Sequence, residues 1–426
     1  MFSPGFVKNP EHVHTVRTDR NRRARRIVTG VPSGTPERAR VRMSFADTER
    51  TWEELRHEVQ HRADRGLTPF IGLEPDDARD ALARIGSLDR DAWGEAWIAN
   101  GDRFMDEAER ARDPDVRCAL RLRAWHNYSV GRWPVPLSES KERSYLGALE
   151  AFRAAAPLLD PPVETLRIDS ADGVIVAHLR LPRGVRPAPV VLTLSGLDSR
   201  KEDDIAMLSD PYLARGIGVA AVDMPGTGEA PLRNQPGAER MFSRVLDALQ
   251  AHRDVDAGRI AVRGRSWGSY WAAVLGIVER DRLRGAVVHG GPVHHYFSGE
   301  WQRRSLATRE YLFDFYPALA SIFGATSFED YLARVAPMSL VARGLIDRPS
   351  APMLVANGAK DTLVPIEDLT LLLSHGSAKT AWVNPQGAHM GRSPDWPQLK
   401  ILGDVIVPWI SDVLDRPAPT HNPPAA

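Results

Sequence analysis

A serine flanked by glycines, in Gly264-Arg265-Ser266-Trp267-Gly268, follows an apolar strand-like run and precedes a stretch with a helical pattern. A G-x-S-x-G turn between a strand and a helix holds its serine in a strained conformation and lifts the hydroxyl above the sheet. We therefore predict that Ser266 is a nucleophile. Because glycine and serine are common residues, the pentapeptide alone also fits an ordinary turn.

A serine nucleophile needs a base to take its proton and a carboxylate to orient that base, in the chain order serine, acid, histidine. Asp361 follows the buried-strand pattern of residues 352–358, and His389 follows a second short strand at residues 380–384. Taken singly, the aspartate also fits a helix cap and the histidine a surface loop. Because all three residue types occur in order after successive strands, we predict Asp361 as the orienting acid and His389 as the general base.

Acyl transfer also needs N–H donors for the oxyanion that forms on the substrate. The first predicted donor is the backbone N–H of Trp267, which follows the nucleophile. An apolar run at residues 189–194 ends near Gly196, and it predicts the backbone N–H of Leu197 as the second donor. Asp198 competes for this role, and Gly196 also fits a simple strand terminator.

The elements that must hold these residues change character along the chain. Residues 51–157 have helical patterns without strand alternation, and Asp113-Pro114 predicts a helix start with the carboxylate as cap and proline at the first position. An apolar stripe with a spacing of four follows, and a second helix is predicted from Glu142 to Ala156. The stripe consists of Val116, Leu120, Ala124 and Tyr128. Asp160-Pro161-Pro162 predicts the domain boundary, because paired prolines stop a helix.

Strands alternating with helices follow this boundary, which favours an α/β fold with a mostly parallel sheet and helices on both faces. The predicted strands are residues 174–181, 190–194, 218–222, 260–262, 285–289, 353–356 and 381–383. An aromatic-rich stretch, residues 292–349, interrupts the alternation and predicts helices beside the mouth of the active site. The predicted divisions are a basic arm (1–50), a helical cap (51–160), a catalytic domain (161–415) that contains this insertion, and a flexible tail (416–426).

The composition of the chain argues against nucleic-acid binding and membrane insertion. The 426 residues include 55 basic and 55 acidic side chains, so no net charge favours nucleic acid or an anionic membrane. Cys118 is the only cysteine, which rules out an intramolecular disulfide and fits a reducing cytoplasm. No signal peptide or membrane-spanning stretch is recognisable, so we expect a soluble, cytoplasmic protein. We interpret the arginine-rich stretch at residues 17–26 as a solvated arm or subunit contact.

Residues 117–414 resemble the α/β-hydrolase superfamily, within the group that has an amino-terminal helical cap. This group includes the fermentation-respiration-switch esterases, 2,6-dihydropseudooxynicotine hydrolase and the fungal pigment polyketide-shortening hydrolases. The resemblance rests on Ala151–Pro162, Ser195–Asp203, Asp223–Glu229 and the motifs around Ser266, Asp361 and His389. It implies a cap-covered serine hydrolase that acts on esters or on carbon–carbon bonds next to a ketone. It also gives candidates for the pocket lining, each of which also fits core packing: Trp125, His126, Tyr128 and Trp133.

Further candidates for substrate contacts follow residues 285–289. His294 or His295 could bind a substrate oxygen or assist proton transfer, because imidazole titrates near neutral pH. Glu300 is a weaker candidate, since a charged loop residue is usually solvated. Without further ligands at suitable spacing we expect no metal and no cofactor.

The function predicted from these residues is hydrolysis through an acyl-enzyme, on a small and mainly apolar or polyketide-like substrate. The cleaved bond is a carbon–carbon bond next to a ketone or an ester or lactone bond. Acyl transfer or cyclisation in a biosynthetic pathway would use the same residues, and a non-catalytic binding module is the third alternative. Caps of this group often pair subunits, so the resemblance is also compatible with a homodimer.

Overall fold

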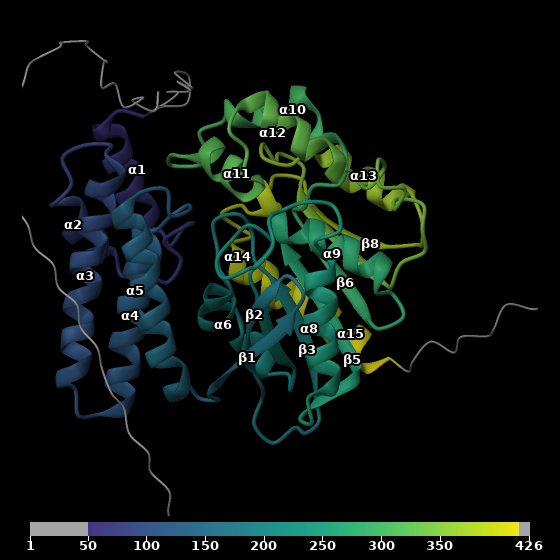
Figure 1. The fold of residues 1–426 in the computed structure, drawn as a ribbon, viewed down its shortest axis with the longest axis horizontal. Coiled ribbons are helices and arrows are strands. Elements are labelled where there is room, and N and C mark those ends of the chain that lie inside the picture. The colour runs from purple at the N-terminus through teal and green to yellow at the C-terminus, as the bar shows by residue number, and fades with distance from the viewer. Residues whose placement is uncertain (1–49, 417–426) are drawn as a thin grey trace, which may run out of the picture. The chain divides into compact units, whose positions relative to one another are not determined.

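The computed structural model describes residues 50–416 of the chain, as drawn in Figure 1. The predicted basic arm and tail therefore lie outside the described residues, apart from Arg50 and Arg416. Between Trp52 and Leu158 every regular element is a helix, and strands alternate with helices from Val163 onward. The change falls at the predicted boundary, Asp160-Pro161-Pro162.

We use the name cap for the amino-terminal helices α1 to α5 and the loops between them; α3, α4 and α5 pack against one another. Their bounds are α1 (Trp52–Asp64), α2 (Pro75–Leu82), α3 (Arg90–Arg110), α4 (Pro114–Gly131) and α5 (Glu139–Ala155). The predicted start of α4 is confirmed, because the Asp113 carboxylate accepts hydrogen bonds from the N–H groups of Asp115 and Val116. The predicted stripe is buried only toward its end, since Val116 is 49% exposed and Ala124 is fully buried.

The part of the chain from Val163 onward, called the catalytic part after its predicted role, contains one sheet of eight strands in the order β1-β2-β4-β3-β5-β6-β7-β8. The pairs β1–β2 and β2–β4 are antiparallel, and all others are parallel. The strands are β1 (Val163–Ser170), β2 (Gly173–Arg180), β3 (Ala188–Leu194), β4 (Gly218–Val222), β5 (Val255–Arg265), β6 (Gly285–His289), β7 (Met353–Gly358) and β8 (Thr380–Asn384). Strand β1 was not predicted. Its polar side chains are largely exposed because it forms an edge of the sheet.

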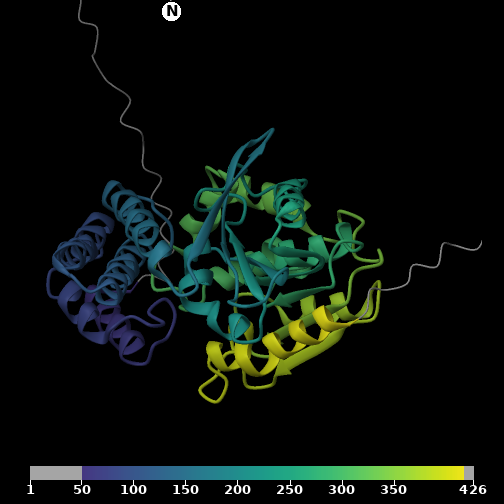
Figure 2. The ribbon, with the colours of Figure 1, turned by 90° about the horizontal axis from the view of Figure 1, so that it is seen from below.

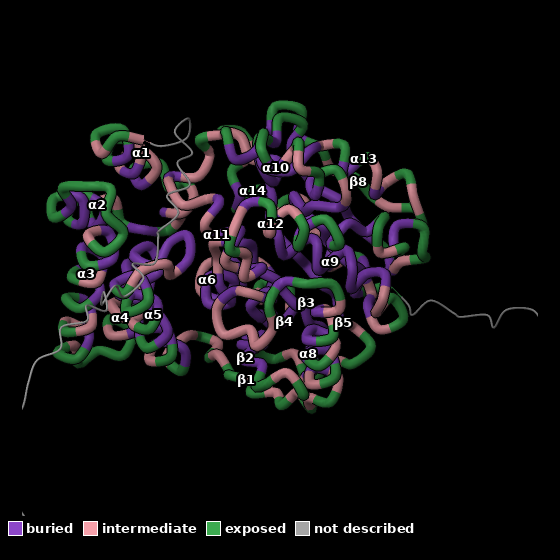
Figure 3. The backbone as a smooth tube through the Cα atoms, turned by 45° about the horizontal axis from the view of Figure 1, so that its top comes forward, coloured by how far each residue is buried: buried purple, intermediate pink, exposed green. Residues whose placement is uncertain are grey.

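Helices cover both faces of this sheet, as Figure 2 shows. Alternate residues of β3, β4, β5, β6 and β7, among them Val191, Ala261 and Val287, form one core cluster with α6 and the carboxyl-terminal helices. These helices are α6 (Lys201–Leu208), α14 (Gln398–Ile401) and α15 (Val407–Asp415), the last two joined by a π-helical turn, η5 (Leu402–Ile406). The other helices of the sheet region are α7 (Asp210–Leu213), α8 (Arg240–Ala251), α9 (Trp267–Val278) and α13 (Ile366–Ser374). Strands β3, β4, β6 and β7 are buried along their length, and so is α9 up to Ile277 (Figure 3).

The predicted helical insertion lies between β6 and β7 and contains α10 (Gly299–Leu306), α11 (Phe315–Phe323) and α12 (Phe328–Val335). Between α10 and α11 runs a segment, residues 309–314, that we call the strap. Arginine side chains from the amino-terminal helical part and the residue just before it hold the strap at both ends. The Arg50 guanidinium donates to the carbonyls of Arg309 and, at 2.6 Å, Tyr311, and Arg90 forms a 2.7 Å ion pair with Asp314.

Candidate active site

Ser266 occupies the sharp turn between β5 and α9, with φ 51° and ψ −127°. Its N–H donates to the carbonyl of His289 at 2.8 Å, which ties the turn to the end of β6. Glycine is required on both sides of it. A Cβ on Gly264 would lie 2.2 Å from the carbonyl oxygen of Gly268, and a Cβ on Gly268 would lie 2.2 Å from that of Leu194. Positive φ at a non-glycine residue costs about 1–3 kcal/mol, and the close packing of strand and helix maintains it here.

His389 contacts Ser266 on one side and Asp361 on the other, so the structure brings the three predicted residues together. The Nε2 atom of His389 lies 2.9 Å from Ser266 Oγ, and its Nδ1 atom lies 2.8 Å from Asp361 Oδ2. The two loops that carry them follow β8 and β7, which are adjacent parallel strands. Strand ends of this kind bring residues distant in sequence to one edge of the sheet.

Backbone contacts fix both loops. A Cβ on Gly358, at the end of β7, would lie 2.2 Å from the carbonyl oxygens of Gly387 and Ala388, so the histidine loop packs directly on this strand end. Asn357 Oδ1 accepts from the N–H of Met390 at 3.0 Å. The imidazole is therefore held by its ring contacts and also by the backbone on both sides of it.

Asp361 is suited to hold the imidazole as an anion. Its side chain is fully buried, and Oδ1 accepts hydrogen bonds from the N–H groups of Leu363 and Val364 at 2.8 and 3.0 Å. Burial by itself raises the pKa of this carboxyl, but the charge and hydrogen bond of His389 and the backbone donor outweigh it, so the pKa is lowered. A carboxylate that stays ionised keeps a proton on Nδ1 of His389 and leaves Nε2 free to accept the serine proton.

The two predicted oxyanion donors lie beside the nucleophile. Trp267 is the first residue of α9, where a backbone N–H has no partner within the helix. Leu197 follows β3, and a Cβ on the neighbouring Gly196 would lie 3.2 Å from Ser266 Cβ. Within residues 50–416, neither N–H donates a hydrogen bond to another protein group. The choice between Leu197 and Asp198 as second donor stays a prediction.

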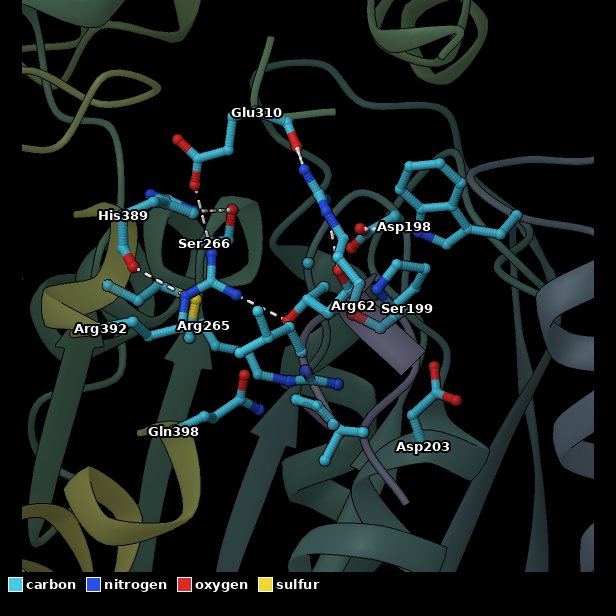
Figure 4. Close-up of a pocket in the computed structure, with 18 of the residues that line it drawn as sticks. Arg62, Asp198, Ser199, Asp203, Arg265, Ser266, Glu310, His389, Arg392 and Gln398 are labelled. Atoms are coloured by element: carbon cyan, nitrogen blue, oxygen red, sulfur yellow. Dashed lines mark hydrogen bonds and ion pairs between the residues drawn. The ribbon is translucent and has the colours of Figure 1, made fainter. Parts of the chain in front are cut away.

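A cavity of about 620 Å³ opens at Ser266 and is lined by cap and catalytic residues together. Pockets for small ligands usually measure ~300–1,000 Å³. Ser266 and His389 line the side of the cavity that the strand ends form (Figure 4), and residues from α1, α4 and the loop after α1 line the opposite side. Apolar side chains also contribute to the wall, including Leu67, Val130, Met207, Leu208 and Leu363.

Of the four cap residues predicted to line the pocket, His126 and Trp133 do so. Burial lowers the pKa of His126 to about 4, so this imidazole is neutral near pH 7. Trp133 donates from Nε1 to Asp198 Oδ2 at 3.0 Å and stacks on Tyr311. The prediction was wrong for the other two, because both belong to the cap core: Trp125 packs on Phe152, and the Tyr128 hydroxyl donates to Asp102 at 2.6 Å.

The histidines after β6 and Glu300 lie outside this cavity wall, which corrects the sequence interpretation. The buried carboxylate of Asp368 accepts hydrogen bonds from four consecutive N–H groups, those of residues 293–296, and so turns this loop toward α13. His294 then contacts the Ser339 hydroxyl at 2.7 Å, whereas His295 and Glu300 are exposed.

Several charged cavity residues were not predicted, among them Arg62, Arg265, Glu310 and Arg392, which Figure 4 labels. Arg62 pairs with Glu58 of the same cavity at 2.7 Å, and Arg265 pairs at 3.0 Å with Asp204, which lies outside the lining. Arg392 Nε donates to the carbonyl of His389 at 2.9 Å. Glu310 lies on the strap, where the sequence offers no motif. The sequence signals for this group were the position of Arg265 directly before Ser266 and the short spacing from His389 to Arg392.

The wall also contains a buried arginine, Arg132, which contacts Asp203 at 3.3 Å. Burial, together with the nearby Arg200, lowers the pKa of Arg132 to about 10, and the group remains a cation at neutral pH.

Within the part of the chain that the structure describes, no three histidine, cysteine or carboxylate side chains cluster as a metal site would require. None of the helices formed by residues 50–416 has the length and apolar character needed to span a bilayer.

The chain is similar in sequence to known esterases. It is 27% identical over 339 residues to the esterase FrsA of Serratia proteamaculans (strain 568), and this match covers 73% of this chain and 80% of that protein. Over 325 residues it is 26% identical to the esterase FrsA of Escherichia coli O157:H7, with 71% and 77% covered.

Solved structures agree on the fold. That of 2,6-dihydroxy-pseudo-oxynicotine hydrolase matches with a TM-score of 0.69 at 23% identity, and it covers 86% of this chain and 98% of that one. Wild-type AbyA5 matches with a TM-score of 0.65 at 24% identity, with 84% and 94% covered. The α/β-hydrolase fold predicted from the sequence is thereby confirmed. The model of the family described as "Esterase FrsA-like" matches residues 76–386, so the chain belongs to this family of α/β-hydrolase esterases.

Proposed function

We propose that this protein hydrolyses a carboxylic ester through a covalent acyl-serine at Ser266, with His389 as general base and Asp361 as its orienting acid. The observation that carries the proposal is the continuous contact chain from Ser266 Oγ through the imidazole to a buried carboxylate, with links of 2.9 and 2.8 Å. These distances suit proton transfer from a serine hydroxyl. Membership in an esterase family supports the same reaction.

In the first half of the reaction, Ser266 Oγ attacks the ester carbonyl carbon while its proton passes to His389 Nε2. The N–H groups of Trp267 and Leu197 donate to the oxyanion of the tetrahedral intermediate. The intermediate collapses, the bond to the leaving oxygen breaks, and the proton on Nε2 passes to this oxygen. An alcohol departs and the acyl group stays on Ser266.

In the second half, a water molecule gives a proton to His389 Nε2 and attacks the acyl carbon. Collapse of the second intermediate returns the proton to Ser266 and releases a carboxylic acid. Asp361 stays ionised throughout, because its function is to hold Nδ1–H and to stabilise the imidazolium that forms twice per cycle.

The cavity suggests the size of the substrate and its mixed character. A volume of about 620 Å³ suits a molecule larger than a simple acetate ester. Leu67, Val130 and Met207 offer apolar contact, and the neutral imidazole of His126 and the hydroxyl of Tyr311 offer hydrogen bonds. We propose a small-molecule ester with an apolar acyl part and at least one polar group; an aromatic or polyketide-like acyl part is compatible with this wall.

Carbon–carbon cleavage next to a ketone would use the same nucleophile and oxyanion donors, with a carbanion as the leaving group instead of an alkoxide. Acyl transfer or cyclisation would replace the second-half water by another nucleophile. Both remain alternatives that a product analysis separates, because hydrolysis adds one water to the products and cyclisation adds none.

The test combines labelling with product analysis. A fluorophosphonate should modify the wild-type protein at Ser266 and leave Ser266→Ala unmodified. Ser199→Ala is the matched control, since Ser199 is a second serine of the same cavity, and it should still be labelled at Ser266. Mass spectrometry of reactions with aryl esters, lactones and β-diketones then identifies the bond that is broken. Unmodified wild-type protein, or equal labelling of Ser266→Ala, would refute the proposal and favour a binding module.

A further inference from the structure

Arg392 lies three residues after the proposed general base and binds its backbone. The Nε atom of this arginine donates to the carbonyl oxygen of His389 at 2.9 Å. His389 begins a tight turn, η4 (His389–Gly391), in which Met390 has φ 63° and Gly391 has φ 77°. The N–H of Met390 is held as well, by Asn357 Oδ1 at 3.0 Å. A bond to the carbonyl of His389 therefore helps to fix the backbone from which the imidazole extends.

The same guanidinium reaches the cap. Its Nη1 atom donates to the hydroxyl of Thr68 at 2.6 Å, in the loop between α1 and α2. Its Nη2 atom lies 3.4 Å from Glu310 Oε1 on the strap. One planar side chain thus joins three segments that are far apart in sequence, and its side chain is only 25% exposed. A rigid fork with several donors is the property that distinguishes arginine from lysine at such a junction.

Glu310 completes the connection to the acid. Its Oε2 atom accepts from the hydroxyl of Thr362 at 2.8 Å, and Thr362 directly follows Asp361. The backbone carbonyl of Glu310 accepts from Arg62 Nη2 of α1 at 2.9 Å. Glu310 and Arg392 together therefore link the histidine loop, the aspartate loop and the cap, as part of the cavity wall in Figure 4.

We propose that Arg392 and Glu310 are positioning residues for His389, and that the cap contributes to this function through Thr68. The inference rests on the function proposed above. None of the three side chains exchanges a proton with the substrate. They hold the backbone of the histidine loop, so that Nε2 stays within hydrogen-bond reach of Ser266 when Nδ1 binds Asp361. Docking of the cap then becomes a condition for an aligned triad as well as for a closed cavity.

The expected size of the effect follows from the tolerance of the geometry. A displacement of about 1 Å at a catalytic group can lower a rate by about 10²-fold. Loss of the Arg392 fork frees the carbonyl of His389 but leaves the ring contacts to Ser266 and Asp361 in place. We therefore expect Arg392→Met to lower kcat by about 10- to 100-fold, with KM within about threefold of the wild-type value.

The experiment measures the rate of fluorophosphonate labelling, because this reaction reports the alignment of Ser266 and His389 without a bound substrate. Arg392→Met should label about 10- to 100-fold more slowly than wild type. Arg392→Lys should recover part of the rate, since an ammonium can still reach one of the three acceptors. Glu310→Gln and Thr68→Val should each slow labelling by a smaller factor. Arg244→Met, at an exposed ion pair on α8, is the control and should label at the wild-type rate.

A double variant tests the contribution of the cap. If Thr68 acts only through the guanidinium, Thr68→Val should have no further effect once Arg392→Met is present. A purely structural role would instead lower the melting temperature without changing the labelling rate per folded molecule. Wild-type labelling rates in Arg392→Met, or in both Glu310→Gln and Thr68→Val should Arg392→Met fail to fold, would overturn the inference. Absence of labelling in the wild-type protein would instead overturn the proposed function.

Discussion

Asp361→Asn tests the proposed proton path, because it removes one charge and changes almost no volume. The asparagine oxygen can still accept from the N–H groups of Leu363 and Val364, which now bind Oδ1. The amide NH₂ then takes the place of Oδ2 and faces His389 Nδ1, so that two donors would meet. The imidazole avoids this by moving its proton to Nε2, and Nε2 can then no longer accept the proton of Ser266.

The expected loss can be worked out from this tautomer change. In serine hydrolases with this triad, the equivalent change lowers kcat by about 10⁴-fold, which corresponds to about 5 kcal/mol of transition-state stabilisation. The Asp361 side chain is fully buried behind the histidine and takes no part in the cavity wall. We therefore expect KM to stay within about threefold of the wild-type value, since contacts to the ground-state substrate are unchanged.

The same variant changes the pH dependence of stability. The pKa of Asp361 in the folded protein is lowered, so the carboxylate stabilises the fold above its unfolded pKa of ~3.9. This contribution is lost as the pH falls through the lower, folded pKa. Asparagine does not titrate. The difference in unfolding free energy between wild type and Asp361→Asn should therefore shrink as the pH is lowered from 5 toward 2, as urea unfolding would measure.

The assay is steady-state hydrolysis of an aryl ester by folded protein, with circular dichroism to verify the fold. Asp368→Asn is the matched control, because Asp368 is also a buried carboxylate that accepts backbone N–H groups but lies outside the cavity wall. It should lower stability and leave kcat within a few-fold of wild type. A kcat of Asp361→Asn within tenfold of wild type would refute the assignment of this carboxylate as the orienting acid.

Two further substitutions test the packing around the site. Gly268→Ala places a Cβ 2.2 Å from the carbonyl oxygen of Leu194. We therefore expect the unfolding free energy to fall by at least about 3 kcal/mol and the activity to be lost, as thermal unfolding and ester hydrolysis would measure. An active variant with an unchanged melting temperature would contradict the tight turn. Burial lowers the pKa of Lys141 to about 8 from 10.5, so between these pH values the unfolded chain binds a proton that the folded chain lacks. Relative to Lys141→Met, wild-type stability in urea should rise across this window by up to about 3 kcal/mol, and equal pH slopes for the two proteins would show that Lys141 titrates normally.

The parts of the molecule that local chemistry determines were predictable from the sequence. Ser266, Asp361 and His389 each follow a strand, and parallel strands bring such positions to one edge. The helix start at Asp113 follows from capping, and the end of the helical segment before Pro161-Pro162 follows from the missing N–H of proline. These features depend on residues within a few positions of each other, so no tertiary information was needed to find them.

Features that depend on distant partners were not predictable in the same way. The loop with His294 and His295 turns away from the cavity because Asp368, more than 70 residues later, binds its N–H groups. Arg392 and Glu310 carry no motif, since their function depends on where the strap crosses the histidine loop. Strand β1 was missed because its alternation is short, limited to Leu166 and Ile168 with Arg167 and Asp169, and none of its residues is fully buried.

The strap has a consequence for how a substrate reaches Ser266. Arg50, just before α1, binds the carbonyl of Arg309 at one end, Arg90 of α3 binds Asp314 at the other, and Arg62 of α1 binds the carbonyl of Glu310 between them. Side chains of the strap also stack against cap aromatics, as Tyr311 does on Trp133. A segment that lies between β6 and β7 in the sequence is therefore bound to the cap, while its Glu310 also contacts Thr362 and Arg392 beside the proposed triad. A substrate that enters by separating the cap from the sheet would have to break one of these two sets of contacts.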